Sequence, residues 1–281
     1  MQKKFLVPNL FTGLNFLLGI GSILVMHETF TDPGAEKSLF WFSKPPLILA
    51  GWMIIWCTLL DKLDGVSARL LRATSAFGAQ FDSMADLAAF GIAPGLLVYS
   101  YTQKLDPTWF ASHRTVMLVA CSLYMLCAAL RLARYNAVDS ANLDRFIQGL
   151  PSPFAGGIVV LLVILHAGHV ANRPEATGTF FFAGLLIAMS LLMVSPLYLP
   201  KLGRRKNRGV NAFQLVNVVA GYLCGFGMIF PEYLLALLVA YATVGFSLGL
   251  LDRRRLVPGL GEATEEHRQT HRVAGTGAPP S

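Results

Sequence analysis

Long apolar stretches alternate with short polar segments along the whole chain. Eight of these stretches come close to the roughly 20 residues that a helix needs to cross a bilayer. The last two can also be read as one re-entrant pair. The pattern therefore predicts an all-α polytopic membrane helix bundle with about eight transmembrane helices. The predicted spans are residues 5–26, 46–66, 82–101, 115–135, 151–171, 178–199, 212–230 and 232–250.

Composition supports this architecture. Apolar residues make up 54% of the chain and charged residues only 14%, a balance typical of membrane proteins and unusual for soluble ones. No detached soluble domain is expected. The segment 251–281 is polar and is predicted to be a disordered tail. The four cysteines lie within apolar stretches without metal-ligand spacing, so each is expected to be a small buried apolar side chain.

The net charge of +7 is distributed unevenly between the two sides of the predicted bundle. With eight spans both ends lie on one side, and that side holds 18 of the 23 Lys and Arg residues. This asymmetry follows the positive-inside rule and predicts that both termini face the cytoplasm. The basic segment 201–211 is interpreted as a cytoplasmic topology determinant, with binding of anionic lipid as the alternative. No nucleic-acid partner is expected.

Four carboxylates interrupt the apolar pattern where the second span ends and the third begins. Asp61 and Asp64 are three residues apart, and Asp82 and Asp86 are four apart, so each pair shares one helical face. Carboxylates at membrane depth are costly and usually functional. A turn ending near Gly78 would bring the two pairs together as oxygen ligands for a hard divalent cation. The alternative, a water-facing acidic helix, conflicts with the apolar flanks.

The residues around these carboxylates follow the pattern D-x2-D-G-x2-A-R-x8-G-x3-D-x3-D between Asp61 and Asp86. Every position matches the signature of the CDP-alcohol phosphotransferases, and the chain therefore resembles that family of integral membrane enzymes. The family transfers a phosphoalcohol group from a CDP-linked donor to an acceptor hydroxyl. The resemblance covers residues 1–200 and implies a six-helix transmembrane core there, before the basic loop 201–211, additional helices in 212–250 and the tail 251–281.

The resemblance also implies site roles. Asp61, Asp64 and Asp82 are expected to hold Mg²⁺ or Mn²⁺, with Asp86 near a second metal ion and acting as the catalytic base. Asn9 can equally be a helix cap, since Pro8 and Asn9 begin the first helix. The donor-contacting positions implied by the family are Asn9, Thr12, Gly65, Ala68, Arg69, Ser75 and Gly78.

A second block ends the fourth span. The sequence from Arg131 to Asn136, followed by Gly149 to Pro153, resembles the phosphatidylserine synthase branch of the family. That resemblance implies serine as the acceptor, whose carboxylate would pair with Arg131 or Arg134 while Asn136 adds a polar contact. Alternatively, both arginines only anchor a helix at the cytoplasmic interface.

The expected reaction is transfer of the phosphatidyl group from CDP-diacylglycerol to L-serine, giving phosphatidylserine and CMP. A sister enzyme using glycerol phosphate or inositol phosphate is the alternative within the family. A cation transporter is the non-enzyme alternative, but it predicts internal repeats, which the sequence lacks. The resemblance further implies a multi-pass protein of the cell (inner) membrane, surrounded by membrane lipids, with a cytoplasmic active site and a homodimeric state.

Overall fold

The computed structural model shows a helical bundle with two very short strands. The structure describes residues 6–31, 44–70, 76–137, 146–170, 179–200 and 208–256. The elements are α1 (Leu6–Thr31), α2 (Pro46–Leu70), α3 (Ala76–Asp86), η2 (Leu87–Ile92), α4 (Ala93–Leu105), α5 (Pro107–Ala137), β1 (Phe146–Gln148), α6 (Ser152–Val170), α7 (Thr179–Val194), β2 (Tyr198–Pro200), α8 (Arg208–Gly227) and α9 (Pro231–Leu256).

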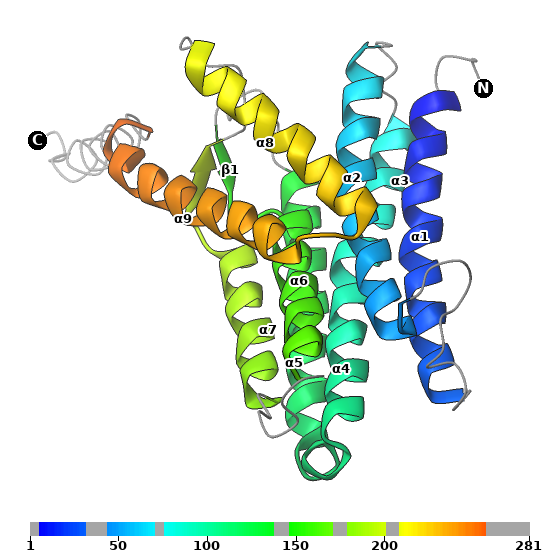
Figure 1. Ribbon diagram of the computed structural model, residues 1–281. Helices are drawn as coiled ribbons and strands as arrows, with labels where there is room; N and C mark the ends of the chain where they lie inside the picture. Colours follow the sequence, from blue (N-terminus) through cyan, green and yellow to red (C-terminus); the bar gives the residue numbers. More distant parts are fainter. Residues whose placement is uncertain are drawn as a thin grey trace, which may run out of the picture.

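The helices α1 to α7 run side by side, while α8 and α9 lie obliquely across the bundle (Figure 1). Neither α8 nor α9 reaches the end of the bundle at which α4 meets α5. β1 follows α5 in the chain and β2 follows α7. The two strands pair antiparallel, and β2 packs against α9. The polytopic all-α architecture predicted from the sequence is confirmed.

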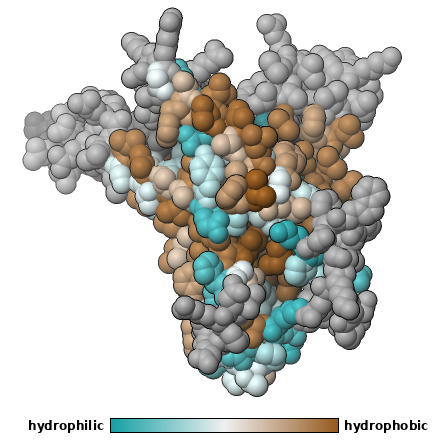
Figure 2. Space-filling model, viewed as in Figure 1, coloured by the Kyte–Doolittle hydropathy of each residue, from teal (hydrophilic) through white to brown (hydrophobic). Residues whose placement is uncertain are grey.

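Six helical segments within the described residues are long and apolar enough to cross a membrane. One of the six segments, Phe77–Leu105, comprises α3, η2 and α4, which follow one another without a break. α7 is apolar but has only 16 residues, and α8 is not among the six. Each of the eight predicted stretches therefore contains a helix, but the stretch 178–199 ends in β2, and α8 and α9 depart from simple parallel spans. Figure 2 shows apolar surface over the middle and upper part of one face, with hydrophilic residues gathering at the lower end.

Close contacts between small residues hold α1 against its neighbours. α1 packs along α2 and also crosses α3 and η2. At the crossing with η2, a Cβ on Gly19 would lie 3.0 Å from the Cα of Ala89, so the two backbones touch without a side chain between them. One turn closer to the N-terminus of α1, the Phe16 ring packs against the Phe81 ring of α3, with ring centroids 6.2 Å apart. These contacts place α1 directly beside the helix that carries two of the four carboxylates.

The core is continuous through the bundle. Most of its largest fully buried side chains come from α2, η2, α4, α5, α6 and α7, and two more, Leu150 and Leu199, come from the β1–α6 connection and β2. Three of the four cysteines are buried and the fourth is partly buried, and all are free thiols, which confirms the apolar role predicted for them. The fully buried side chains include Trp52, Phe90, Leu97, Tyr124, Leu161 and Phe182.

Gly19→Ala should destabilise the protein because the added Cβ meets backbone atoms of Ala89, which no rotamer change can move away. The expected loss is about 1–3 kcal/mol, the usual cost of overpacking. Gly13→Ala is the matched control on the same helix, because its Cβ would lie 4.0 Å from the nearest atom, on the Phe81 ring. Thermal denaturation of both variants in detergent measures the difference. Equal midpoints for the two variants would contradict the proposed close contact.

Candidate active site

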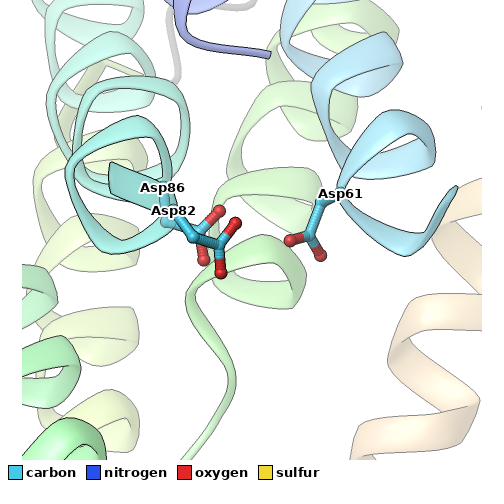
Figure 3. Close-up of side chains that lie close together, drawn as sticks. All are labelled: Asp61, Asp82 and Asp86. Carbon is cyan, nitrogen blue, oxygen red and sulfur yellow. The ribbon is translucent and has the colours of Figure 1, made fainter. Parts of the chain in front are cut away.

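Three of the predicted carboxylates converge between two helices. Asp61 projects from α2, and Asp82 and Asp86 project toward it from α3 (Figure 3). Their ligand oxygens lie within 4.8 Å of one another. Asp82 and Asp86 are four residues apart, about one helical turn, and so share one face of α3. The predicted meeting of the two helices at their carboxylates is confirmed for these three residues.

Several predicted residues of the motif fall outside the described part of the structure. The side chains of Asp64, Gly65, Ala68 and Arg69 are among them, although α2 carries their backbone, and Ser75 lies outside it altogether. Their roles stay predictions. Gly78 is described and lies in the first turn of α3, one turn before Asp82.

The helix carrying Asp82 and Asp86 changes its winding directly after the second carboxylate. Residues Leu87–Ile92 form a π-helical turn, an irregularity that often occurs at functional sites. The wider turn displaces backbone carbonyls, and the hydroxyl of Tyr124 in α5 donates a hydrogen bond to Phe90 O at 2.9 Å. From the other side, Gly156 of α6 approaches so closely that a Cβ would lie 3.3 Å from the same oxygen. The neighbouring helices thus fix the turn that positions Asp86.

Arg131 of α5 is the buried cation beside these carboxylates. Only 7% of its surface is exposed, and its charge interacts favourably with Asp86 and, more weakly, with Asp61. Its Nη1 donates to the hydroxyl of Ser152 at 2.8 Å, at the first residue of α6. Its Nε has no hydrogen-bond partner among the described residues. A buried guanidinium with an unused donor next to an acidic cluster is suited to holding an anionic group.

Arg134 lies one turn further along α5 and points elsewhere. Its guanidinium donates to the carbonyl oxygens of Val194, Met193 and Gln148 at 3.1, 3.4 and 3.3 Å. It therefore caps the carboxyl end of α7, where unpaired carbonyls favour a cation. Gly149 completes this junction with φ at +72°, and a Cβ there would collide with the Met193 carbonyl oxygen.

Asn136 connects α5 to α3. Its Nδ2 donates to the hydroxyl of Ser83 at 2.8 Å, and Ser83 in turn donates to Ala79 O at 3.0 Å. Ser83 directly follows Asp82, so this contact fixes the carboxylate-bearing second half of α3 relative to the end of α5. Of the three residues predicted for the acceptor, only Arg131 has a described charge interaction with the carboxylates.

The inner face of α1 covers the site from the remaining side. Thr12 is 4% exposed, and the buried Nδ2 of Asn9 has no hydrogen-bond partner within the described residues. One turn below Thr12, Asn15 is fully buried, and neither polar atom of its amide has a partner among these residues. The backbone carbonyl oxygen of Asn15 accepts a hydrogen bond from the thiol of Cys57, which lies one turn before Asp61 on α2. A buried amide without partners is costly, so this face of α1 presents hydrogen-bonding groups that a bound ligand would satisfy.

The donor set fits a hard divalent cation. It consists of carboxylate oxygens alone, contributed by two helices, which is the ligand chemistry that Mg²⁺ and Mn²⁺ prefer. Like charges this close repel strongly, and a cation between them removes the repulsion. Asp61, Asp82 and Asp86 are the described residues able to hold it.

Sequence reasoning missed three residues of this region. Asn15 could have been found, because it continues the helical face of Asn9 and Thr12 by one more turn. Ser152 was part of a quoted motif but gave no sign that it would bind Arg131. Tyr222 of α8, whose hydroxyl donates to Leu59 O at 2.9 Å, carries no sequence signal at all.

Comparison with protein-family models matches residues 5–198 to the family described as CDP-alcohol phosphatidyltransferase. The chain belongs to this family. The match includes all three converging carboxylates and ends before α8. An enzyme that transfers substituted phosphate groups, which the signature predicted, is therefore confirmed, and the transporter alternative is set aside.

Several curated proteins are similar over most of the chain. A Helicobacter pylori protein is 33% identical over 206 residues, which cover 73% of this chain and 76% of the relative. A Mycobacterium bovis protein is 32% identical over 67% of this chain and 64% of its own length. A Methanocaldococcus jannaschii protein is 28% identical over 71% of this chain and 84% of its own. All three are named CDP-diacylglycerol–serine O-phosphatidyltransferase.

Proposed function

We propose that this membrane protein transfers the phosphatidyl group of CDP-diacylglycerol to the hydroxyl of L-serine, giving phosphatidylserine and CMP. The observation that carries the proposal is the convergence of Asp61, Asp82 and Asp86 beside the buried cation of Arg131. The names of the similar proteins support the same donor and acceptor. Glycerol phosphate or inositol phosphate remains the alternative acceptor.

A divalent cation, Mg²⁺ or Mn²⁺, would be held by Asp61, Asp82 and Asp86, with Asp64 as a further ligand. When bound, it would neutralise the oxygens around the reacting phosphorus, which an alcohol otherwise attacks poorly. On the donor side, we propose that Asn9, Thr12, Gly65, Ala68, Arg69, Ser75 and Gly78 contact the CDP moiety. The unpartnered Nδ2 of Asn9 supports this role over simple helix capping.

Asp86 is the proposed general base. It is mostly buried, it begins the π-helical turn, and Arg131 stabilises its charge. The serine hydroxyl oxygen forms a bond to the phosphatidyl phosphorus as its proton passes to an Asp86 oxygen. The bond from that phosphorus to the bridging pyrophosphate oxygen breaks, and CMP leaves with the electron pair. No covalent phospho-enzyme is required.

Arg131 is the proposed partner of the serine carboxylate. Its buried guanidinium keeps an unused Nε donor, whereas Arg134 already binds three backbone carbonyls. Asn136 would contribute indirectly, through Ser83 and the carboxylate-bearing half of α3. The two arginines therefore differ in what they can do for the acceptor, although both lie on the same face of α5.

The excess of basic residues on one predicted side supports a cytoplasmic position for both termini and for the carboxylates, in the cell (inner) membrane. That side is also where serine and a CDP-linked donor would be supplied. A homodimeric state and the division of the chain at residue 200 stay predictions.

Asp82→Asn should abolish CMP release while leaving the protein folded, because one charged ligand is lost from the carboxylate cluster. Titration of Mn²⁺ with purified protein, together with a CMP-release assay, measures both effects. Asp106→Asn is the control, since Asp106 begins α5 away from the cluster. Full activity of the wild type in excess chelator would contradict the metal requirement.

Asp86→Asn should lower turnover far more than donor binding, because an amide cannot take the serine proton. Calorimetric binding of CDP-diacylglycerol in the presence of Mn²⁺ provides the binding constant, and CMP release provides the rate. If donor binding disappears together with turnover, Asp86 is primarily a metal ligand and another group must be the base.

Arg131→Lys should raise the apparent serine constant about tenfold or more, consistent with losing a charge-assisted hydrogen bond worth about 1.5–3 kcal/mol. Arg134→Lys is the matched control, and its serine constant should stay unchanged while stability falls, because it loses contacts to the end of α7. Both constants are measured at saturating donor. A wild-type preference for glycerol phosphate over serine would favour the sister-enzyme alternative.

A further inference from the structure

The helical pair α8–α9 lies outside the matched family region but contacts the helix that carries Asp61. The family match ends at residue 198, and α8 begins at Arg208. α8 descends obliquely toward α2, and α9 then runs back across the bundle (Figure 1). α8 packs on α2, and α9 packs on α6 and β2. The pair is therefore attached to two helices of the site rather than to the outer rim of the bundle.

The contact between α2 and α8 consists of two reciprocal hydrogen bonds, which we call the α2–α8 clasp. The indole Nε1 of Trp56 in α2 donates to Gly225 O in α8 at 3.0 Å. The hydroxyl of Tyr222 in α8 donates to Leu59 O in α2 at 2.9 Å. On each helix the two participants are three residues apart, so they share one face. Each helix thus donates one side-chain hydrogen bond to the backbone of the other.

The two helices approach closely at the clasp. A Cβ on Gly225 would lie 2.7 Å from Cδ1 of Leu59, so only glycine fits without moving that side chain. In an apolar environment, buried polar groups need partners, and a paired donor and acceptor are costly to separate. The clasp is therefore a specific attachment and not only apolar contact.

The clasp lies next to the carboxylate cluster. Leu59, whose carbonyl oxygen accepts the Tyr222 hydrogen bond, precedes Asp61 by two residues on α2. Asp61 is the only described member of the cluster that comes from α2, since Asp82 and Asp86 share α3. The separation of the two sets of ligands therefore depends on how α2 is held at this turn.

We infer that Tyr222 is a positioning residue, which through the clasp holds the Asp61-bearing turn of α2 at the distance from α3 that divalent-cation binding requires. The inference rests on the proposed metal site and assigns to α8 a part in it. A helix outside the matched family region would then help to set the affinity of the site for its cation.

Tyr222→Phe tests this inference, because it removes one hydroxyl and keeps the ring. Tyr233→Phe is the matched control: its hydroxyl donates to Asn217 Oδ1, also at 2.9 Å, but this hydrogen bond joins α9 to α8 and not α8 to α2. Full-length wild type and both variants are purified in detergent without substrate, and Mn²⁺ binding is titrated by electron paramagnetic resonance. Thermal midpoints without metal are recorded alongside.

Tyr222→Phe should weaken Mn²⁺ binding about three- to tenfold, the range expected for losing one hydrogen bond. Tyr233→Phe should leave Mn²⁺ binding unchanged. Trp56→Phe, which removes the other donor of the clasp, should weaken Mn²⁺ binding in the same direction as Tyr222→Phe. The apparent serine constant at saturating Mn²⁺ should stay at the wild-type value in Tyr222→Phe.

Unchanged Mn²⁺ binding in Tyr222→Phe overturns the inference, and so does equal weakening in both tyrosine variants, which would indicate a general loss of helix packing. If wild type binds Mn²⁺ and Asp82→Asn does not, the proposed metal site stands whatever Tyr222→Phe shows. If wild type binds no Mn²⁺, the metal site fails and the inference fails with it.

Discussion

The repulsion among Asp61, Asp82 and Asp86 is the interaction on which the arrangement of this bundle depends. Two ionised carboxylates whose oxygens lie within 4.8 Å of each other repel by at least about 3 kcal/mol at an effective dielectric constant near 20. The fold must therefore hold the helices together against this repulsion, and a cation in the cluster converts the same proximity into binding energy.

Two features of the structure oppose that repulsion. The first is geometric: Gly19 and Gly156 let backbones approach where a side chain would separate them, and Gly225 leaves room for the Leu59 side chain. The Tyr124 hydroxyl also donates a hydrogen bond to the π-helical turn after Asp86. The second is electrostatic, since Arg131 places a positive charge beside Asp86 in a buried position. A buried charge is stabilising only when paired, so Arg131 and the carboxylates depend on each other.

The sequence predicted the carboxylate cluster well because helical spacing is a local property. Residues three or four apart must share a face, and apolar flanks leave only a buried or membrane-level position for them. The same rule failed to separate Arg131 from Arg134, which also share a face. What distinguishes them is tertiary: the turn at Gly149 and the end of α7 bring carbonyl oxygens to Arg134, and Ser152 comes to Arg131. Contacts between residues so far apart in the chain leave no periodic pattern to read.

The contribution of α8 and α9 was the least predictable part for the same reason. Their apolar composition predicted two more spans, yet α8 lies obliquely and donates a tyrosine hydroxyl to the backbone of α2. Apolar periodicity reports only that a helix avoids water, and it cannot distinguish a lipid-facing helix from one attached to a site. In this bundle the distinction comes from a few polar groups on otherwise apolar helices. Each needs a partner at membrane depth, so Trp56, Tyr222 and Arg131 fix the relative positions of helices whose apolar surfaces alone would allow many.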